Sequence, residues 1–403
     1  MGHVRGTERQ RVSVDAVHAA AECLGWFSID GRAPELWDKF SGLYRARDGW
    51  VRVHANFRHH REGALRLLGL DPGHADRKAA EQAMLSWAAQ AFEDAAARAG
   101  LVATACRSFA QWDATEAGRA IAAQPLFTLT RLGDAEPLPL PPLSAQHRPL
   151  EGVRVLDLTR ILAGPVGGRA LAAYGADVML VNAPHLPNIE AIADTSRGKR
   201  SALVDLRTPE GRAAMDDLVA GAHVFVQGYC PGALHRLGYG PEQLALRRPG
   251  IVCVSLSAYG PQGPWKDRRG FDSLVQTATG FNLAEAEAAG DPGRPRALPM
   301  QILDEASGYL IAFGAAAALR RQQLEGGSWH VQVSLAQTGH WLRQLGRVPN
   351  GFAVTPPELE PLLETTASRY GALRAVRHSA GLGRTPALWR RPSERPGDSE
   401  ARW

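Results

Sequence analysis

The sequence predicts an α/β fold in which a doubly wound parallel sheet is joined to a smaller α+β unit. From residue 150 onward, short β-branched runs alternate with segments whose apolar residues recur at helical spacing. Before that point the chain carries a hairpin signal and a helical pattern instead. At 403 residues it is also too long for one ordinary core. We therefore expect two folded units.

A Pro-rich stretch marks the boundary between these units. The segment "AEPLPLPPLSAQHRP", residues 135–149, can form neither a helix nor an inner strand. We therefore divide the chain into a small α+β domain (1–134), this linker, and a large Rossmann-like domain (150–348). A Pro- and Arg-rich tail, 349–403, is expected to wrap loosely around the rest.

The first unit contains one hairpin and one long helix. "GLYRARDGWVRVH", residues 42–54, predicts two strands around Asp48-Gly49, a strong hairpin-turn pair. Residues 78–100 show helical spacing of apolar residues and stop at a glycine, which predicts a single helix.

The second unit alternates strands and helices in chain order. Strands are predicted at residues 153–158, 177–181, 201–206, 224–227, 251–257 and 329–335. Helices are predicted at 208–221 and 304–323. This alternation is typical of a parallel sheet wound on both faces.

The charge pattern argues against a nucleic-acid partner. The 46 basic and 41 acidic residues leave a formal net charge of +5, and they are interleaved along the chain. Nucleic-acid binding needs basic residues gathered on one face, often with aromatic residues among them. A small positive surplus still helps attract a small anionic ligand.

The cysteines and the apolar segments exclude several other classes. Cys23, Cys106, Cys230 and Cys253 lie far apart and form no CxxC pair, so neither a metal site nor a disulfide framework is indicated. The start of the chain is polar, unlike a signal peptide. The most apolar run, residues 308–319, is shorter than the roughly 20 residues that a membrane span needs. We expect a cytoplasmic protein without a membrane partner.

A glycine-rich turn follows the first strand of the large unit. In "DLTRILAGPVGGRALAAYG" the glycines stand where a strand runs into a helix, a geometry that points backbone N–H groups at an anion. The spacing Gly164-x-x-Gly167-Gly168 does not match the dinucleotide fingerprint, and the second strand ends in Asn182 rather than an acid. NAD binding is therefore disfavoured, while binding of another anion stays open.

Six ordered blocks in residues 150–338 resemble the class III CoA-transferase family. After "LEGVRVLDLTRILAGPVGGRALAAYGADVMLV" come "GKRSALVDLRTPEGR", "YCPGALHRLGYGPEQL", "VSLSAYGPQGP" with "GFDSLVQTATG", "ILDEASGYLIAFGAAAALRR" and "GSWHVQVSLAQT". The family includes formyl-CoA transferase, carnitine CoA-transferase and α-methylacyl-CoA racemase. The resemblance implies a Rossmann-like large domain, acyl-CoA and carboxylic-acid substrates, and no cofactor beyond coenzyme A as substrate.

The first unit resembles the same family in a different order. "YRARDGWVRVH" and "LVATACRSFAQWDATEAGRAIAAQPLF" are similar to the small domain that follows the "VQVSL" strand in the family. In this chain the segment comes first, so we infer a permuted order. The alternative is an unrelated α+β module. Family members form interlocked homodimers, and a homodimer is therefore implied as well.

The resemblance also implies a set of CoA contacts. Coenzyme A is a polyanion, so cations and helix N-termini are the groups that suit its phosphates. The implied contacts are Arg160, Ile161, Ala163, Lys199, Arg200, Tyr229 and Arg236. For each cation the alternative is an ordinary exposed surface charge.

The implied chemistry uses an ionised aspartate as the nucleophile. Its carboxylate attacks the thioester, expels the CoA thiolate as a mixed anhydride forms, and takes the thiolate back as an aspartyl-CoA thioester. Asp291 lies where transferases of this type carry the nucleophile, but "DPGRP" is also a turn sequence. Asp272 and Asp304 also fit family motifs, with a role at a helix start as their alternative.

Several departures bear on the activity. In the racemase branch that this family includes, a histidine immediately precedes the aspartate of the "GFD"-type motif and takes part in proton transfer. Phe271 stands at that position here. A phenyl ring cannot carry a proton, so racemisation by that route is disfavoured. Leu162, Cys230 and Asn182 replace polar or charged residues frequent in the family. These changes imply a different acyl substrate, or a non-catalytic or partner-dependent relative that binds CoA esters.

Overall fold

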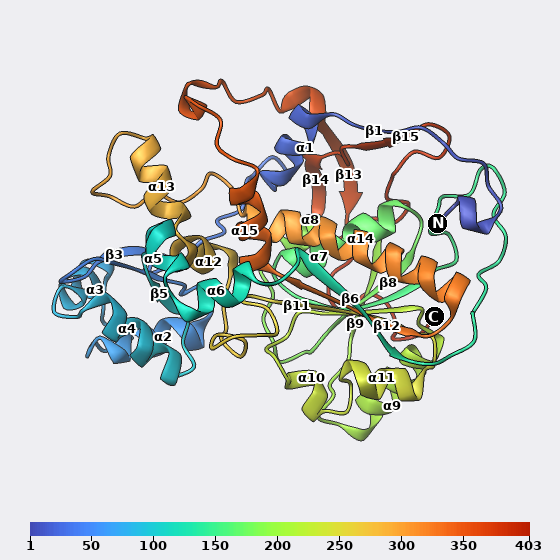
Figure 1. Ribbon diagram of the computed structural model, residues 1–403, viewed down its shortest axis with the longest axis horizontal. Coiled ribbons are helices and arrows are strands. Elements are labelled where there is room, and N and C mark those ends of the chain that lie inside the picture. The colour runs from blue at the N-terminus through green and yellow to red at the C-terminus, as the bar shows by residue number, and fades with distance from the viewer.

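A computed structural model describes residues 1–403, and its centre is a seven-stranded sheet (Figure 1). The strand order is β6-β12-β11-β10-β7-β8-β9, and every neighbouring pair is parallel except β12 with β6. The strands are β6 (Phe127–Gly133), β7 (Arg154–Leu158), β8 (Asp177–Asn182), β9 (Lys199–Leu203), β10 (Val224–Gln227), β11 (Val252–Ser257) and β12 (Ser328–Ser334). The predicted α/β class is confirmed.

Helices cover both faces of this sheet. On one face lie α7 (Ala163–Ala173) and α14 (Ile302–Glu325), and on the other α9 (Pro209–Gly221) and α11 (Pro241–Arg247) (Figure 1). Because side chains alternate along a strand, neighbouring residues enter different cores. Val155 packs in the core under α7 and α14, while Leu156 packs in the core under α9 and α11.

The first unit packs three helices on a small antiparallel sheet. Its strands are β3 (Gly42–Arg45), β4 (Trp50–Val53) and β5 (Ala103–Ala105), and its helices are α2 (Arg58–Leu67), α3 (Arg77–Met84) and α4 (Ala89–Arg98). Phe92 and Met84 lie fully buried in its core. The predicted hairpin is confirmed, with Arg45 paired to Trp50 across its turn.

The helix predicted over residues 78–100 is two helices, α3 and α4. The break has a tertiary cause: the Asp48 carboxylate of the hairpin turn accepts the Ala89 N–H at 2.8 Å, which starts a new helix at that point. The carbonyl of Trp87 also accepts the Arg47 N–H, at 2.9 Å. Helical spacing alone does not reveal such a contact with a distant turn.

A third group of elements connects the two ends of the chain. β2 (Phe27–Ile29) pairs with β14 (Gly371–Val376), which pairs with β13 (Leu363–Ser368). β1 (Val12–Val14) pairs with β15 (Ala380–Leu382). The expectation of a loosely wrapped tail is therefore wrong, since the tail completes two sheets.

The remaining elements are short or connect these layers. They are α1 (Ala16–Cys23), α5 (Phe109–Asp113), α6 (Glu116–Ala122), α8 (Ile192–Thr195), α10 (Ala233–Arg236), α12 (Asp272–Thr279), α13 (Phe281–Ala288) and α15 (Leu335–Gln344). Residues 135–149 contain neither helix nor strand, as predicted. α12 contacts β4 and β5, so the first unit packs directly against the large one.

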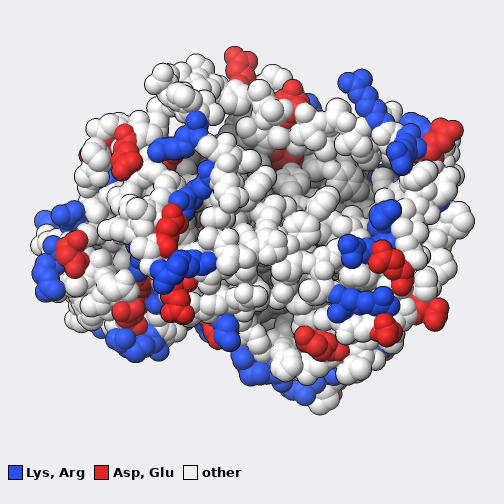
Figure 2. Space-filling model, in the orientation of Figure 1, with Lys and Arg blue, Asp and Glu red and all other residues white.

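One helix, α14, is long and apolar enough to cross a membrane by length and composition alone. In the structure, 61% of its most apolar window is buried inside the protein, where it packs on α7 and β12. This burial is what a core helix requires. On the face shown in Figure 2, basic and acidic side chains are interspersed over most of the surface, with a run of basic side chains along its lower edge.

Candidate active site

The main candidate site is a cavity of about 330 Å³ at the carboxyl ends of β7, β10 and β11. From β7 the chain continues to β8 and β9 on one side of the sheet, and then crosses to β10 on the other side of β7. The strand order therefore reverses between β7 and β10. Parallel sheets bind ligands at such a switch point, outside the carboxyl ends of the strands. The first unit closes the cavity with Phe57, His59, His60 and Val102.

The loop between β7 and α7 forms one wall and holds an unusual backbone conformation. Ile161 has φ +74°, in the left-handed region that a β-branched residue rarely adopts. Arg160, Ile161, Leu162 and Ala163 all line the cavity. Ala163 begins α7, whose N-terminal N–H groups therefore lie at the cavity wall. Such strain persists where the surrounding structure enforces it, commonly at binding sites.

A buried ion pair holds this loop from behind. Lys199 is fully buried, and its Nζ donates to Asp157 Oδ2 and to the Pro165 carbonyl, both at 2.8 Å. The other oxygen of Asp157 accepts the Thr159 hydroxyl at 2.5 Å. No room remains around the pair, because a Cβ on Gly168 would lie 2.2 Å from Asp157 Oδ2.

The structure does not place Lys199 or Arg200 at the cavity, contrary to the sequence prediction. Lys199 is enclosed as described, so it has no surface to offer a phosphate. Arg200 is half-buried and donates to Asp177 at 2.8 Å and to the Arg402 carbonyl at 2.6 Å. The strand predicted at 201–206 is observed as β9, which begins two residues earlier, at Lys199, and ends at Leu203.

Four of the other five predicted CoA contacts line the cavity. Tyr229 lines it, together with Arg160, Ile161 and Ala163. Arg236 lies outside it on α10, exposed and without an ion pair. Arg160 is half-buried, donates to the Pro187 carbonyl and lies 5.5 Å from the Phe57 ring centre.

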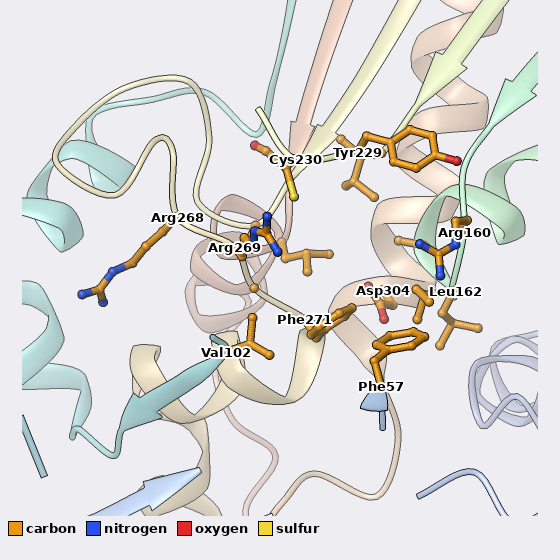
Figure 3. A pocket seen from close by; sticks show the side chains of 18 of the residues that line it. Phe57, Val102, Arg160, Leu162, Tyr229, Cys230, Arg268, Arg269, Phe271 and Asp304 are labelled. Atoms are coloured by element: carbon orange, nitrogen blue, oxygen red, sulfur yellow. The ribbon is translucent and has the colours of Figure 1, made fainter. Parts of the chain in front are cut away.

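One carboxyl group lines the cavity, and it belongs to Asp304 in the first turn of α14. It is 9% exposed, its side chain makes no hydrogen bond, and Figure 3 shows it between Phe271 and Leu162. Burial, followed by the charge of Asp272, raises the pKa of Asp304 well above its ordinary value. Asp304 is therefore protonated far more readily than an exposed aspartate.

Asp272 lies behind Asp304, at the start of α12. It is fully buried, and its Oδ2 accepts the Asp304 N–H at 2.9 Å, while Gln276 donates to its other oxygen. Burial raises the pKa of Asp272 in spite of these donors. Asp272 therefore does not line the cavity but holds the start of α14 in place.

Asp291, the predicted nucleophile, lies elsewhere. It is exposed in the turn after α13, where its N–H donates to the Ala286 carbonyl at 3.0 Å and its carbonyl accepts from Arg294 at 3.2 Å. Asp291 does not line the cavity. In the observed conformation its contacts are those of a turn residue.

The first unit supplies cavity residues that sequence reasoning missed. His60 is 5% exposed, and neither of its ring nitrogens has a hydrogen-bond partner. Burial, with smaller contributions from His59 and Arg269, lowers its pKa to about 4. Phe271 stacks on His54 with ring centres 4.0 Å apart and so joins the two units. The only sequence signal was the adjacent pair His59-His60, which no motif explained.

Two further arginines line the cavity, with different roles. Arg268 donates to Glu93 at 2.7 Å and stacks on Trp265, and Figure 3 shows its side chain directed away from the other labelled residues. Arg269 is exposed and makes no hydrogen bond. Arg269 is therefore available to an anionic ligand, and the "KDRRGFD" sequence could have indicated it.

The cavity can thus hold an anion through α7, Arg160 and Arg269, beside one isolated carboxyl group. No group of three or more His, Cys, Asp or Glu side chains in the chain could hold a metal ion. The walls are otherwise mostly apolar, which suits a ligand with an apolar part.

Comparisons with known proteins show what the chain is similar to. Residues 150–348 match the family described as CoA-transferase family III. A probable fatty acyl-CoA transferase, Rv3272, from Mycobacterium tuberculosis is 34% identical over 55% of this chain and 59% of its own length. An acyl-CoA transferase from Gibberella moniliformis is 29% identical over 83% of this chain and 66% of its own length. This chain therefore spans less than two thirds of the length of these curated relatives.

Among solved structures, a CAIB/BAIF family protein from Brucella suis is 26% identical, with a TM-score of 0.44, over 56% of this chain and 65% of that one. The alignment to the Gibberella moniliformis protein covers far more of this chain than residues 150–348.

Proposed function

We propose that the chain, whose residues 150–348 match CoA-transferase family III, moves CoA between an acyl-CoA and a carboxylic acid. The observation that carries the proposal is the switch-point cavity, which presents one carboxyl group, Asp304, beside a helix N-terminus and unpaired cations. A carboxylate is the nucleophile and an anion-binding wall is the support that this exchange needs.

In the proposed reaction a carboxylate oxygen attacks the thioester carbon and the C–S bond breaks. The CoA thiolate leaves, then attacks the anhydride on the aspartyl side and releases the first acid. The incoming carboxylate reverses these steps and departs as its CoA ester. Asp304, in the first turn of α14, has the helix N-terminus to stabilise its anion.

The other two aspartates named from the sequence, Asp291 and Asp272, fit the reaction less directly. Asp291 can serve as the nucleophile only if the loop after α13 moves onto the cavity. Asp272 is enclosed, and its carboxylate accepts the backbone N–H of Asp304. We therefore propose Asp304 as the reacting carboxylate, with Asp291 as the competing assignment.

The experiment compares three variants, Asp304→Asn, Asp291→Asn and Asp272→Asn. Each is incubated with an acyl-CoA and hydroxylamine, which converts an acylated aspartate into a hydroxamate that peptide mass spectrometry locates. We expect the hydroxamate on Asp304 and a loss of turnover of about 10³-fold or more in Asp304→Asn. A hydroxamate on Asp291, lost in Asp291→Asn, would transfer the role to that residue.

A second candidate function is CoA-ester binding without turnover. The raised pKa of Asp304 and the position of Asp291 outside the cavity favour it. Titration calorimetry with coenzyme A and its esters separates the two: binding with no hydroxamate and no exchange supports the binding protein. Absence of any affinity would contradict both.

We also propose that the protein is a cytoplasmic homodimer. Light scattering of the purified chain tests the dimer.

A further inference from the structure

Cys230 gives the cavity a second nucleophile of a different kind. It follows β10, lines the cavity with Tyr229 and Pro231, and is the one exposed cysteine of the four. In Figure 3 its sulfur points toward the space that the labelled residues enclose. It belongs to the same wall as Arg160, whose guanidinium lies within electrostatic reach of the Cys230 thiol.

The other three thiols are poor nucleophiles. Burial raises the pKa of Cys23 and of Cys106 to about 12, and burial also raises the pKa of Cys253. The thiolate is the reactive form of cysteine, so these three groups stay protonated and enclosed. A reagent that enters the cavity therefore meets a single accessible thiol.

An independent feature indicates that the cavity accommodates a ligand with a polar, reactive group. Asp304 is about nine-tenths buried, makes no side-chain hydrogen bond and is directed into the same cavity. A buried polar group without a partner costs free energy unless something pairs with it. Apolar walls between Asp304 and Cys230, with Leu162, Leu256 and Phe271 among them, suit the chain of an acyl thioester.

We propose that Cys230 is an acyl-accepting thiol of this cavity, which takes the acyl group from a bound acyl-CoA. The Cys230 sulfur attacks the thioester carbon, a new S–C bond forms and the bond from that carbon to the CoA sulfur breaks. The proton of Cys230 passes through solvent to the departing CoA thiolate. One thioester replaces another, so no oxidant, reductant or co-reactant is needed, and CoA reverses the step.

This inference rests on the proposed binding of acyl-CoA but not on transferase turnover. The Cys230 thioester forms without a carboxylic-acid acceptor and without an aspartyl intermediate. It should therefore also form in Asp304→Asn. If Cys230 is acylated while exchange is absent, the transferase proposal fails and this one stands. If exchange occurs while Cys230 stays unmodified, this proposal fails and the transferase proposal stands.

The test incubates the full chain with butyryl-CoA, with no acceptor acid, and measures intact mass and peptide masses under acidic conditions. We expect one butyryl group on Cys230, removed by neutral hydroxylamine, and no modification of Cys106. Butyryl-N-acetylcysteamine carries the same thioester without the nucleotide, and it should label Cys230 at least tenfold more slowly at equal concentration. Desulfo-CoA, which cannot exchange, should slow labelling by butyryl-CoA.

The variants Cys230→Ser and Cys106→Ser complete the test. Cys230→Ser should abolish the adduct, while Cys106→Ser should leave it unchanged; peptide mapping of the native chain gives the same answer if either variant fails to fold. Equal rates with both butyryl donors would show only an exposed reactive thiol and would overturn the proposal. A CoA disulfide on Cys230, or the absence of any adduct on Cys230, would also overturn the proposal.

Discussion

At the scale of single residues, the strained backbone of Ile161 is the clearest mark of a binding wall. A β-branched side chain with φ +74° is costly, and the cost falls on the loop that carries Arg160 into the cavity. The buried Lys199–Asp157 pair lies directly behind that loop and fixes both of its ends. We infer that these contacts hold the loop in its binding conformation.

The strain can be measured with two substitutions at one position. Ile161→Ala removes most of the side chain but keeps the unfavourable φ, whereas Ile161→Gly also relieves it. We expect the glycine variant to be more stable than the alanine variant by about 1 kcal/mol, the reverse of the usual order in regular structure. Urea unfolding of both proteins measures the difference. An alanine variant as stable as the glycine variant would mean that the backbone is not strained.

Glu305, the neighbour of Asp304, links the cavity to a buried ionic cluster. Its carboxylate lies 3.8 Å from Arg169, which also contacts Asp194 and Glu22. Because Arg169 is shared among three acids, its attraction only partly offsets burial. Burial raises the pKa of Glu305 to about 8, from an ordinary value of 4.5.

This raised pKa predicts a pH dependence of stability. Between pH 4.5 and 8 the folded protein holds the Glu305 proton while the unfolded chain has released it, so stability falls as pH rises. Glu305→Gln removes this loss, and its advantage over the native chain should grow by about 1 kcal/mol per pH unit between pH 5 and 7. Urea unfolding at three pH values measures it. A pH-independent difference would mean that Glu305 is ionised in the folded protein.

At the scale of elements, the hairpin turn and α4 depend on each other. The Asp48 carboxylate caps α4 at Ala89 from 41 residues away, and this contact explains why one predicted helix is two. The same pattern occurs at α14, where Asp272 accepts the Asp304 N–H. In both cases a distant carboxylate fixes where a helix begins.

Loss of the Asp48 cap should weaken the first unit. We expect Asp48→Ala to lower the free energy of unfolding by about 1 kcal/mol, since Ala89 then lacks its hydrogen-bond acceptor. Asp217→Ala, at an exposed position in α9, is the matched control and should change stability by less than about 0.5 kcal/mol. Equal effects of the two substitutions would argue against the cap.

The elements also show what the sequence could and could not predict. The strand Val224–Gln227 is observed as predicted, because a buried parallel strand is a short β-branched run that local pattern identifies. β6 was missed, since its partner β12 lies some 200 residues away and its own pattern is weak. β14 was missed as well, although it forms a hairpin with β13 in addition to its distant pairing with β2. Long-range pairing leaves little local signal.

The same distinction holds for the site. Arg160 and Ala163 lie at the cavity because they follow a strand directly, which the βα pattern reveals. Lys199 could not be placed, because its buried partner Asp157 lies 42 residues away in sequence. The cavity position of His60 depends on how two units pack, which no local motif encodes.

At the scale of the whole molecule, the tail fastens the large unit to the N-terminal segments. The guanidinium carbon of Arg197 lies 3.9 Å from the centre of the Trp389 ring, and Trp389 donates its Nε1–H to the Arg169 carbonyl at 2.9 Å. His378 bonds to Glu22 at 3.1 Å and to the Tyr174 hydroxyl at 2.9 Å. These contacts join the tail to Arg169 in α7 and to Tyr174 just beyond its end.

Removal of the Trp389 side chain tests this fastening. We expect Trp389→Ala to destabilise the protein by about 3 kcal/mol, through lost burial and the loss of the contact with Arg197. Leu246→Ala is the control, since that side chain is 83% exposed. Thermal and urea unfolding measure both. A cost below about 0.5 kcal/mol would mean that the tail is only loosely attached.

The pairing of Val12–Val14 with Ala380–Leu382 has a consequence for synthesis. A ribosome releases the first of these strands hundreds of residues before its partner exists, so this sheet cannot close during translation. Contacts of such large sequence separation slow folding and leave edges open in the meantime. The emerging polypeptide should therefore wait with an unpaired edge, and chaperone binding to stalled nascent chains is expected to end only when the last strands emerge.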